Sequence, residues 1–228
     1  MIDNTQRSNR TGADKGDDVT RARVLDSAAA LFAENGIDRV TTRAISERAG
    51  ANVAAVNYYF GGKDNLSVEV FRHVARESAE RRFAGLDRIL ENARIAGGPP
   101  PIRDIIEVFV DAYVSADAPR NGTLLAQLVL KHRLSPTHWT QAVVQEELDP
   151  LAKRFISVLC LAAPYLEVRE VHWRYHMMAG AVILTMSDRG AGGRIERLSE
   201  GQSSVDDTET LRAELVNFAT TAFGPTAD

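Results

Sequence analysis

A short run of residues near the amino terminus carries side chains that suit the edge of a DNA base. Val53, Ala54 and Ala55 are small, so a helix with these residues at its tip can approach the bases closely, and their methyl groups can contact thymine methyls. Asn57 has an amide that can bond adenine in a bidentate way, and Tyr58 has a ring and a hydroxyl. These residue types in this order predict a helix that enters a major groove.

Side chains that suit a phosphate flank this run on both sides. Thr42 and Arg43 begin the preceding helix, where free N–H groups and the positive end of the helix dipole favour a phosphate, and Arg43 can also reach a guanine. Tyr59 and Lys63 lie on the other side. Lys63 is expected at the start of a long helix, so its ammonium and the free N–H groups of that helix would meet the same backbone phosphate.

Three helices are predicted to position these side chains. Apolar residues recur at helical spacing over Thr20–Asn35, which predicts the first helix. Thr41 is placed as the N-cap of a second helix, and Gly50 ends that helix in a conformation that glycine adopts at low cost. Asn52 can cap a third helix over Val53–Tyr59, so the connection is that of a helix-turn-helix.

The rest of the chain is also predicted to be helical. A long helix is expected over Lys63–Leu90, and the glycine and proline residues of Ala96–Pro101 end it. Further helices are expected over Ile102–Ala116, Thr123–Leu134, Thr137–Ala163, Glu167–Asp188 and Asp207–Phe223. The sequence has no sustained alternation of period two and no internal repeat, so the predicted fold class is all-α.

The charge of the chain limits how it could bind DNA. The 228 residues carry a net charge of −4, with 9 Lys and Arg against 8 Asp and Glu in residues 1–63, and 18 against 23 in residues 64–228. Phosphate binding relies on clustered Lys and Arg. Because the chain has no general basic field, any DNA contact must come from a few placed groups near the amino terminus.

The composition is typical of a globular protein in a reducing compartment. Cys160 is the single cysteine, so no intramolecular disulfide is possible. Met1–Asp18 lacks the apolar core of a secretory signal and is predicted to be a mobile tail. The longest apolar runs, Phe155–Ala163 and Met177–Met186, are shorter than the ~20 residues that span a bilayer. We therefore expect a cytoplasmic location and no membrane partner.

The sequence lacks the motifs of common enzymes and metal centres. It has no Gly-x-Ser-x-Gly, no His-Glu-x-x-His, no paired carboxylates in a recognisable frame and no dinucleotide fingerprint, so we predict no enzyme activity, no catalytic residue and no cofactor. His172 and His176 lie one helical turn apart, a spacing that can hold a metal, but no Cys, Asp or Glu completes a known pattern, and no metal is expected. Cys160 has apolar neighbours and is predicted to be a buried, inert thiol.

The amino-terminal region carries four motif segments, which are Thr41–Ile45, Ala49–Asn52, Val56–Phe60 and Lys63–Leu66. Their order and spacing resemble the TetR/AcrR family of bacterial transcriptional regulators, and the resemblance covers about Thr20–Leu66. It implies an all-helical homodimer whose amino-terminal three-helix domain binds operator DNA and whose divergent carboxy-terminal domain binds a small inducer. The expected domains are a disordered tail over 1–18, a helix-turn-helix domain over 19–66, and a ligand-binding and dimerisation domain over 67–228.

The resemblance also implies particular DNA contacts. Carried over position by position, the base contacts are Arg43, Val53, Ala54, Ala55, Asn57 and Tyr58, and the phosphate contacts are Thr42, Tyr59 and Lys63. Many relatives have Tyr where Asn57 lies and Ser or Asn where Gly62 lies, so Asn57 is expected to contact a base where relatives contact the backbone. The alternative, a hairpin whose turn merely joins two packed helices, does not explain three polar side chains on the open face.

The carboxy-terminal half resembles the family less closely. Its Trp173–His176, Gly180-Ala181 and Leu198–Gly201 are similar to a branch that includes regulators of fatty-acid metabolism. We expect a mostly apolar inducer, with a fatty acid or an acyl-CoA as candidates, in a pocket lined by aromatic and apolar residues. The candidate pocket residues are Phe109, Tyr113, Leu128, Trp139, Phe155, Trp173 and His176.

Two features of this half are left open by the sequence. Trp173 is placed for a core or dimer interface as well as for a pocket, because the last two long helices form a four-helix bundle in dimers of the family. The small residues of 179–181 would let two such helices approach closely, with Val182, Ile183 and Met186 continuing that face. The favoured function is a repressor that an inducer releases from a palindromic operator; an activator and a domain that binds another protein remain alternatives.

Overall fold

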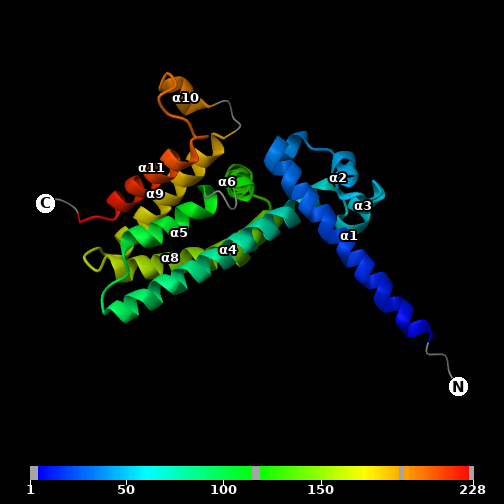
Figure 1. The fold of residues 1–228 in the computed structure, drawn as a ribbon, viewed down its shortest axis with the longest axis horizontal. Helices are drawn as coiled ribbons and strands as arrows, with labels where there is room; N and C mark the ends of the chain where they lie inside the picture. Colours follow the sequence, from blue (N-terminus) through cyan, green and yellow to red (C-terminus); the bar gives the residue numbers. More distant parts are fainter. Residues whose placement is uncertain (1–4, 115–118, 190–192, 226–228) are drawn as a thin grey trace. The chain divides into compact units, whose positions relative to one another are not determined.

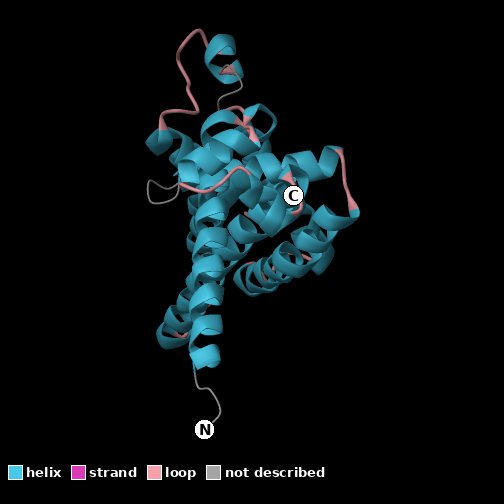
Figure 2. Ribbon diagram, turned by 90° about the vertical axis from the view of Figure 1, so that its right-hand side faces the viewer, coloured by secondary structure: helices cyan, strands magenta, loops and turns pink. Residues whose placement is uncertain are grey.

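The computed structural model describes residues 5–114, 119–189 and 193–225, and every regular element in these ranges is a helix (Figure 1). Loops form only the connections between the helices (Figure 2). The predicted all-α fold is therefore confirmed. The chain divides into two compact units, residues 1–71 and 72–228, and we describe each by itself.

The first unit is a small bundle around the helix-turn-helix. It contains α1 (Thr5–Asn35), a 3₁₀ turn η1 (Ile37–Arg39), α2 (Thr42–Ala49), α3 (Ala54–Phe60) and the first turns of α4 (Lys63–Ala96). Apolar side chains from all four helices are buried together, and this core consists of Val24, Ala28, Phe32, Ile45, Val56, Phe60, Leu66 and Val70. Because α2 and α3 are too short to be stable alone, this burial is what holds them in place.

The amino-terminal segment differs from its prediction. Residues 1–18 were expected to form a mobile tail, but α1 already begins at Thr5. The physical reason is that nucleation is the costly step of helix formation. The packed residues Val24, Ala28 and Phe32 nucleate α1, and each preceding residue can then add one backbone hydrogen bond. The hydroxyl of Thr20 also donates to the carbonyl of Gly16 at 2.9 Å.

The second unit contains the rest of α4 and the remaining helices. They are α5 (Ile102–Val114), α6 (Pro119–Leu134), α7 (His138–Val143), the π-helical stretch η2 (Val144–Leu148), α8 (Asp149–Ala162), α9 (Val168–Ser187), α10 (Arg194–Leu198) and α11 (Thr208–Ala222). Helix α5 packs against α6, α8, α9 and α11, so it lies in the middle of the unit (Figure 1). Its buried face carries Ile105, Ile106, Phe109, Val110 and Tyr113.

One predicted helix of this unit is interrupted. A single helix was expected over Thr137–Ala163, but α7 and α8 are separated by the π-helical stretch η2. Pro150 lies in the first turn of α8 and has no N–H to donate to the preceding turn. The wider π-helical turn before α8 therefore accommodates the hydrogen bond that Pro150 cannot make. Helix α4 also runs further than predicted, to Ala96 instead of Leu90.

The left-handed backbone at Gly50 gives a stability prediction. Gly50 has φ 60° and ψ 37° at the end of α2, and a Cβ atom there would meet nothing within 4 Å. Gly50→Ala should therefore lower the free energy of unfolding by ~1–2 kcal/mol through backbone strain alone. Gly50→Asn, the matched control, should cost less because Asn tolerates this region. Urea unfolding of the three proteins measures this, and equal stability of the alanine variant would contradict it.

Candidate nucleic-acid interface and ligand cavity

The connection between α2 and α3 has the caps that its sequence predicts. The hydroxyl of Thr41 accepts a hydrogen bond from the N–H of Ala44 at 3.1 Å, and Gly50 ends α2 in the left-handed region. The side-chain oxygen of Asn52 accepts from the N–H of Ala54 at 3.0 Å. Helix α3 begins one residue later than expected, with Val53 as its N-cap residue. The turn thus satisfies free N–H groups at the start of both helices.

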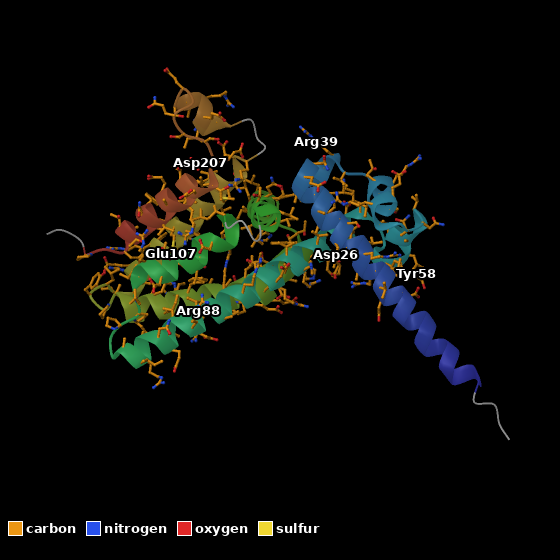
Figure 3. The ribbon with its side chains drawn as sticks, viewed as in Figure 1. Asp26, Arg39, Tyr58, Arg88, Glu107 and Asp207 are labelled. Atoms are coloured by element: carbon orange, nitrogen blue, oxygen red, sulfur yellow. The ribbon has the colours of Figure 1, made fainter. Side chains whose placement is uncertain are left out.

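Helix α3 presents one face to the core and the other to solvent. Val56 and Phe60 are buried, whereas Asn57 is exposed. Tyr58 is 74% exposed (Figure 3). Val53 is 49% exposed at the start of the helix. Ala54 is exposed and Ala55 is half-buried. All five residues predicted to contact bases from α3 and its N-cap therefore retain at least partial exposure, and the larger polar ones point outward.

The guanidinium of Arg43 is held by a carboxylate on its own helix. Its Nε donates to Oε1 of Glu47 at 2.9 Å, and this hydrogen bond raises the pKa of Arg43 above its usual value. The Arg43 side chain is 79% exposed, so the pair is a surface pair and opens at little cost. Thr42, beside it, is half-buried. The hydrogen bond uses only Nε, so the remaining donors of the exposed guanidinium can meet DNA with or without the Glu47 pair.

Tyr59 has a partner that sequence reasoning missed. Its hydroxyl donates to Oδ1 of Asp17 at 2.9 Å, from the part of α1 that was expected to be a tail. Desolvation, together with Asp17, raises the pKa of the Tyr59 hydroxyl, so the group stays protonated. Lys63 is half-buried at the first residue of α4 and makes no ion pair within the described ranges. The lysine is therefore free to meet a phosphate, whereas the tyrosine must first change partner.

Arg21 is a second residue that the sequence did not single out. Its guanidinium lies 5.1 Å from the centroid of the Phe60 ring, and its Nη2 lies 3.3 Å from Oε2 of Glu69. The side chain thus joins α1, α3 and α4 at the base of the exposed face. Arginine in a helix is usually a surface residue, so nothing in its spacing indicated this role.

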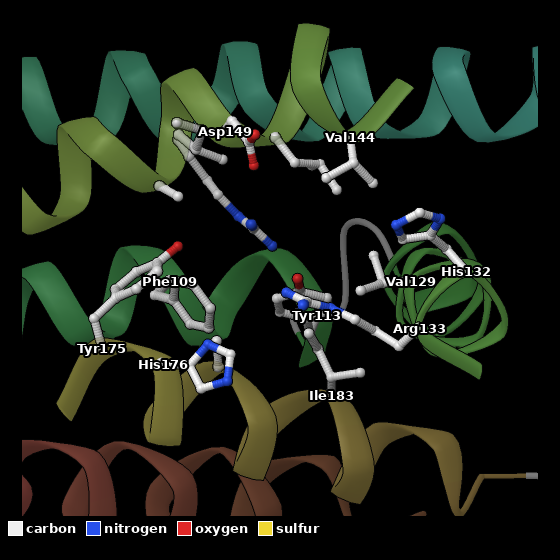
Figure 4. Close-up of a pocket in the computed structure, with 15 residues that line it drawn as sticks. Phe109, Tyr113, Val129, His132, Arg133, Val144, Asp149, Tyr175, His176 and Ile183 are labelled. Atoms are coloured by element: carbon white, nitrogen blue, oxygen red, sulfur yellow. The ribbon is translucent and has the colours of Figure 1, made fainter. Parts of the chain in front are cut away.

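The second unit contains a cavity of about 100 Å³. Among the residues that line it are Phe109, Tyr113, His132, Arg82, Asp149, Tyr175, His176 and Ile183 (Figure 4). Of the predicted pocket residues, Phe109, Tyr113 and His176 line this cavity. Phe155 and Leu128 are buried in the core beside it and do not line it. Trp139 and Trp173 are 61% and 60% exposed and do not line this cavity.

The wall of the cavity is an aromatic cluster. The ring of Phe109 packs edge-to-face against Phe155 and Tyr175, with centroid distances of 5.3 and 5.9 Å. Tyr175 was missed because it lies between Trp173 and His176 on one short segment, and the sequence alone does not say which of the three turns inward. Desolvation of the Tyr175 hydroxyl raises its pKa far above the usual value, so it is a neutral donor at all ordinary pH values.

The possible metal and thiol sites show no reactive arrangement. No group of three or more His, Cys, Asp and Glu side chains able to hold a metal occurs in the described part of the chain. His172 is exposed and His176 lies at the cavity. Cys160 is half-buried, not fully buried as predicted. In the same described part, no helix is both long enough and apolar enough to cross a membrane.

The geometry of α2, its turn and α3 is that of a helix-turn-helix protein. The family description "Bacterial regulatory proteins, tetR family" matches residues 24–70, and "Tetracyclin repressor-like, C-terminal domain" matches residues 107–222. The chain therefore belongs to the TetR family of transcriptional regulators, and the predicted family is confirmed. Its relatives and fold neighbours are regulators, not enzymes.

Individual relatives support the same assignment. The chain is 30% identical over 165 residues to the HTH-type transcriptional regulator BetI of Brucella anthropi, covering 72% of this chain and 78% of that protein. It is 28% identical over 141 residues to the HTH-type transcriptional dual regulator CecR of Shigella flexneri, covering 60% of this chain and 61%, less than two thirds, of that relative.

The fold also matches solved structures. A transcriptional regulator from Saccharomonospora viridis, solved in complex with choline, aligns with a TM-score of 0.64 and 16% identity over 87% of this chain and 94% of that one. HlyIIR, a hemolysin II transcriptional regulator, aligns with a TM-score of 0.55 and 14% identity over 92% and 99%. Such low identity shows a shared fold and nothing more.

His132 gives a prediction for stability against pH. Burial and the nearby charge of Arg133 lower the pKa of its imidazole, and Nδ1 lies 2.9 Å from Oγ1 of Thr140. Below pH ~6.5 the unfolded chain then binds more protons at this histidine than the folded chain, so stability is full above this pH and falls as pH decreases. His132→Gln should remove that part of the decrease. Thermal midpoints from pH ~7.5 to ~5 measure it; identical slopes in both proteins would contradict it.

Proposed function

We propose that the chain is a ligand-responsive repressor that binds a palindromic operator as a homodimer and is released by a mostly apolar small molecule. The observation that carries this proposal is the exposed face of α3, on which Asn57 and Tyr58 point away from a buried core. A hairpin that served only to pack two helices together would not require an amide and a phenol on the exposed face of α3. Two such helices would enter successive major grooves, roughly 34–36 Å apart.

The contacts to DNA divide into two groups. The proposed base contacts are Arg43, Val53, Ala54, Ala55, Asn57 and Tyr58, and the proposed phosphate contacts are Thr42, Tyr59 and Lys63. Tyr59 leaves Asp17 on binding, and this hydrogen bond is exposed. A phosphate replaces Asp17 as the acceptor for the Tyr59 hydroxyl, so no donor is left unpaired.

The dimer is proposed to form through α9 and α11. Helix α9 exposes Trp173, Met177 and Leu184, which are 60%, 64% and 65% exposed, and α11 exposes Phe218. Large apolar side chains on one side of a helix mark an interaction surface. The face differs from the predicted one, since Val182 and Met186 are buried in their own unit and Ile183 lines the cavity. The helical period places 173, 177 and 184 on one side and 182 and 186 on another.

The ligand is proposed to bind in the cavity of the second unit. Helix α4 is continuous from Lys63 to Ala96 and contributes Arg82 to the cavity wall. A ligand that favours one position of α4 therefore changes the position of Lys63 on the same helix, which is coupling through a two-state element. Such a regulator acts on DNA in the cytoplasm and uses no cofactor.

The first test is a gel-shift titration on the DNA that flanks the chain's own gene, at stated salt. Asn57→Ala should relax specificity at one operator position by ~1–3 kcal/mol, because its amide bonds one base. Lys63→Ala should weaken specific and non-specific DNA to a similar extent and reduce the salt slope by about one. Unchanged sequence preference in Asn57→Ala would place Asn57 among the phosphate contacts. Equal affinity of the wild type for specific and non-specific DNA would refute the proposal.

The second test addresses the dimer. Trp173→Arg should place a charge in the proposed interface, shift the chain to monomer in sedimentation velocity and weaken operator binding at least ~tenfold through loss of the second half-site. Trp139→Arg is the matched control, since Trp139 is equally exposed but lies on α7. It should leave the sedimentation coefficient unchanged. A dimer that persists in Trp173→Arg would place the interface elsewhere.

A further inference from the structure

Arg82 is a buried cation, and two of its three side-chain nitrogens have no hydrogen-bond partner among the described residues. Its side chain lies on α4 and is 3% exposed, and both Nε and Nη2 are buried with no partner among the described residues. A guanidinium has five donors in a fixed fork and cannot be deprotonated in a protein. Burial of such a charge is costly unless it is paired. The arginine therefore has unused binding capacity, and it lies in the wall of the cavity.

Two aromatic rings offset part of the free-energy cost of burying the Arg82 charge. The guanidinium carbon lies 4.4 Å from the centroid of Tyr113 and 5.1 Å from that of Phe109. Both contacts place the guanidinium carbon over a ring, while Nε and Nη2 have no hydrogen-bond partner among the described residues. The rings thus offset part of the cost of burying the charge and leave these two nitrogens without an acceptor.

The other charged groups of the cavity do not neutralise Arg82. Asp149 lies in the cavity wall, but no ion pair joins it to Arg82 in the described ranges. Arg133 adds a second positive charge. Burial lowers the pKa of His132, so its imidazole is mostly neutral near pH 7. Two arginines against one carboxylate leave the cavity with a positive balance.

We propose that this cavity binds a small carboxylic acid in its ionised form, with the carboxylate paired in the plane of the Arg82 guanidinium and the apolar part against Phe109 and Ile183. The proposal rests on the function proposed above and names the class of its ligand. Tyr175, protonated at ordinary pH, is a further donor in the same wall. The cavity volume of about 100 Å³ is of the order of the ~150 Å³ that accommodates benzene, so it suits a small acid.

A cationic ligand is disfavoured by the same geometry. Quaternary ammonium groups are recognised by the faces of aromatic rings. Here Arg82 already occupies the faces of Phe109 and Tyr113, so a cation would meet a like charge at that place. Choline, which is present in the Saccharomonospora viridis structure, is therefore a suitable contrasting probe.

The experiment compares butanoate, butanamide and choline on the full-length protein. Thermal midpoints over a concentration series at fixed pH and ionic strength give the affinities, because a ligand of the native state stabilises by mass action. Butanoate should bind at least ~tenfold more tightly than butanamide, since a charge-assisted pair is about twice as strong as a neutral hydrogen bond. Choline should not bind. Equal affinity for acid and amide, no stabilisation by the acid, or tighter binding of choline would overturn the proposal.

Two variants assign the preference to Arg82. Arg82→Met keeps the length of the side chain, and the ratio of acid to amide affinity should fall to about one. Its unliganded midpoint should not decrease, because an unpaired buried charge is removed. Arg88→Met is the matched control, an exposed arginine on the same helix (Figure 3), and should keep the ratio of the wild type. An unchanged ratio in Arg82→Met would overturn the assignment, and the comparison on the wild type stands even if this variant fails to fold.

A gel shift with butanoate separates this inference from the proposed function. If the acid binds in an Arg82-dependent way but leaves the DNA complex intact, the ligand class holds and the proposed release fails. If operator binding is specific but acid and amide bind with equal affinity, the proposed class of ligand is wrong and the proposed DNA-binding function still holds.

Discussion

The DNA-binding face depends on the burial of two side chains of α3. A helix of seven residues does not persist in water by itself, so its orientation depends on the burial of Val56 and Phe60 in the core of the first unit. The guanidinium of Arg21 over the Phe60 ring then ties α3 to α1, and its ion pair with Glu69 adds α4. The exposed residues of α3 are positioned because their neighbours on the same helix are not exposed. A substitution that shrinks Phe60 would therefore disturb the exposed face of α3 without altering any residue on it.

The parts that the sequence predicted are those with local causes. Thr41, Gly50 and Asn52 cap or end helices through bonds to residues one to four positions away, and all three do so in the structure. Amphipathic spacing likewise located most of the helices, among them α5, α9 and α11. The π-helical stretch at Val144–Leu148 was missed because the prediction followed the spacing of apolar residues. That spacing continues through Pro150, although the proline interrupts the backbone hydrogen bonds.

The parts that it did not predict have causes distant in sequence. Tyr59 bonds Asp17, and the interaction exists only because α1 continues past its packed segment. Trp139 and Trp173 were assigned to a pocket by residue type, yet large aromatics serve surfaces between subunits as well as cavities, and only the three-dimensional structure separates these uses. Arg82 was overlooked for the opposite reason, since an arginine among Glu and Arg residues of a long helix is ordinarily solvated.

Arg82 also bears on how a ligand could act on DNA at all. A ligand shifts a conformational equilibrium only by its difference in affinity for the two states. When a ligand contacts only neighbouring helices, its affinity depends on the moving helix indirectly, through the side chains packed between them. Here the donor belongs to α4 itself, the helix that begins at Lys63 and continues without a break to Ala96. A carboxylate paired with Arg82 would therefore be sensitive to the position of this helix directly, because a bidentate pair weakens when its geometry changes. The buried charge of Arg82, which burial disfavours, is thus the same feature that would make a bound carboxylate responsive to helix movement.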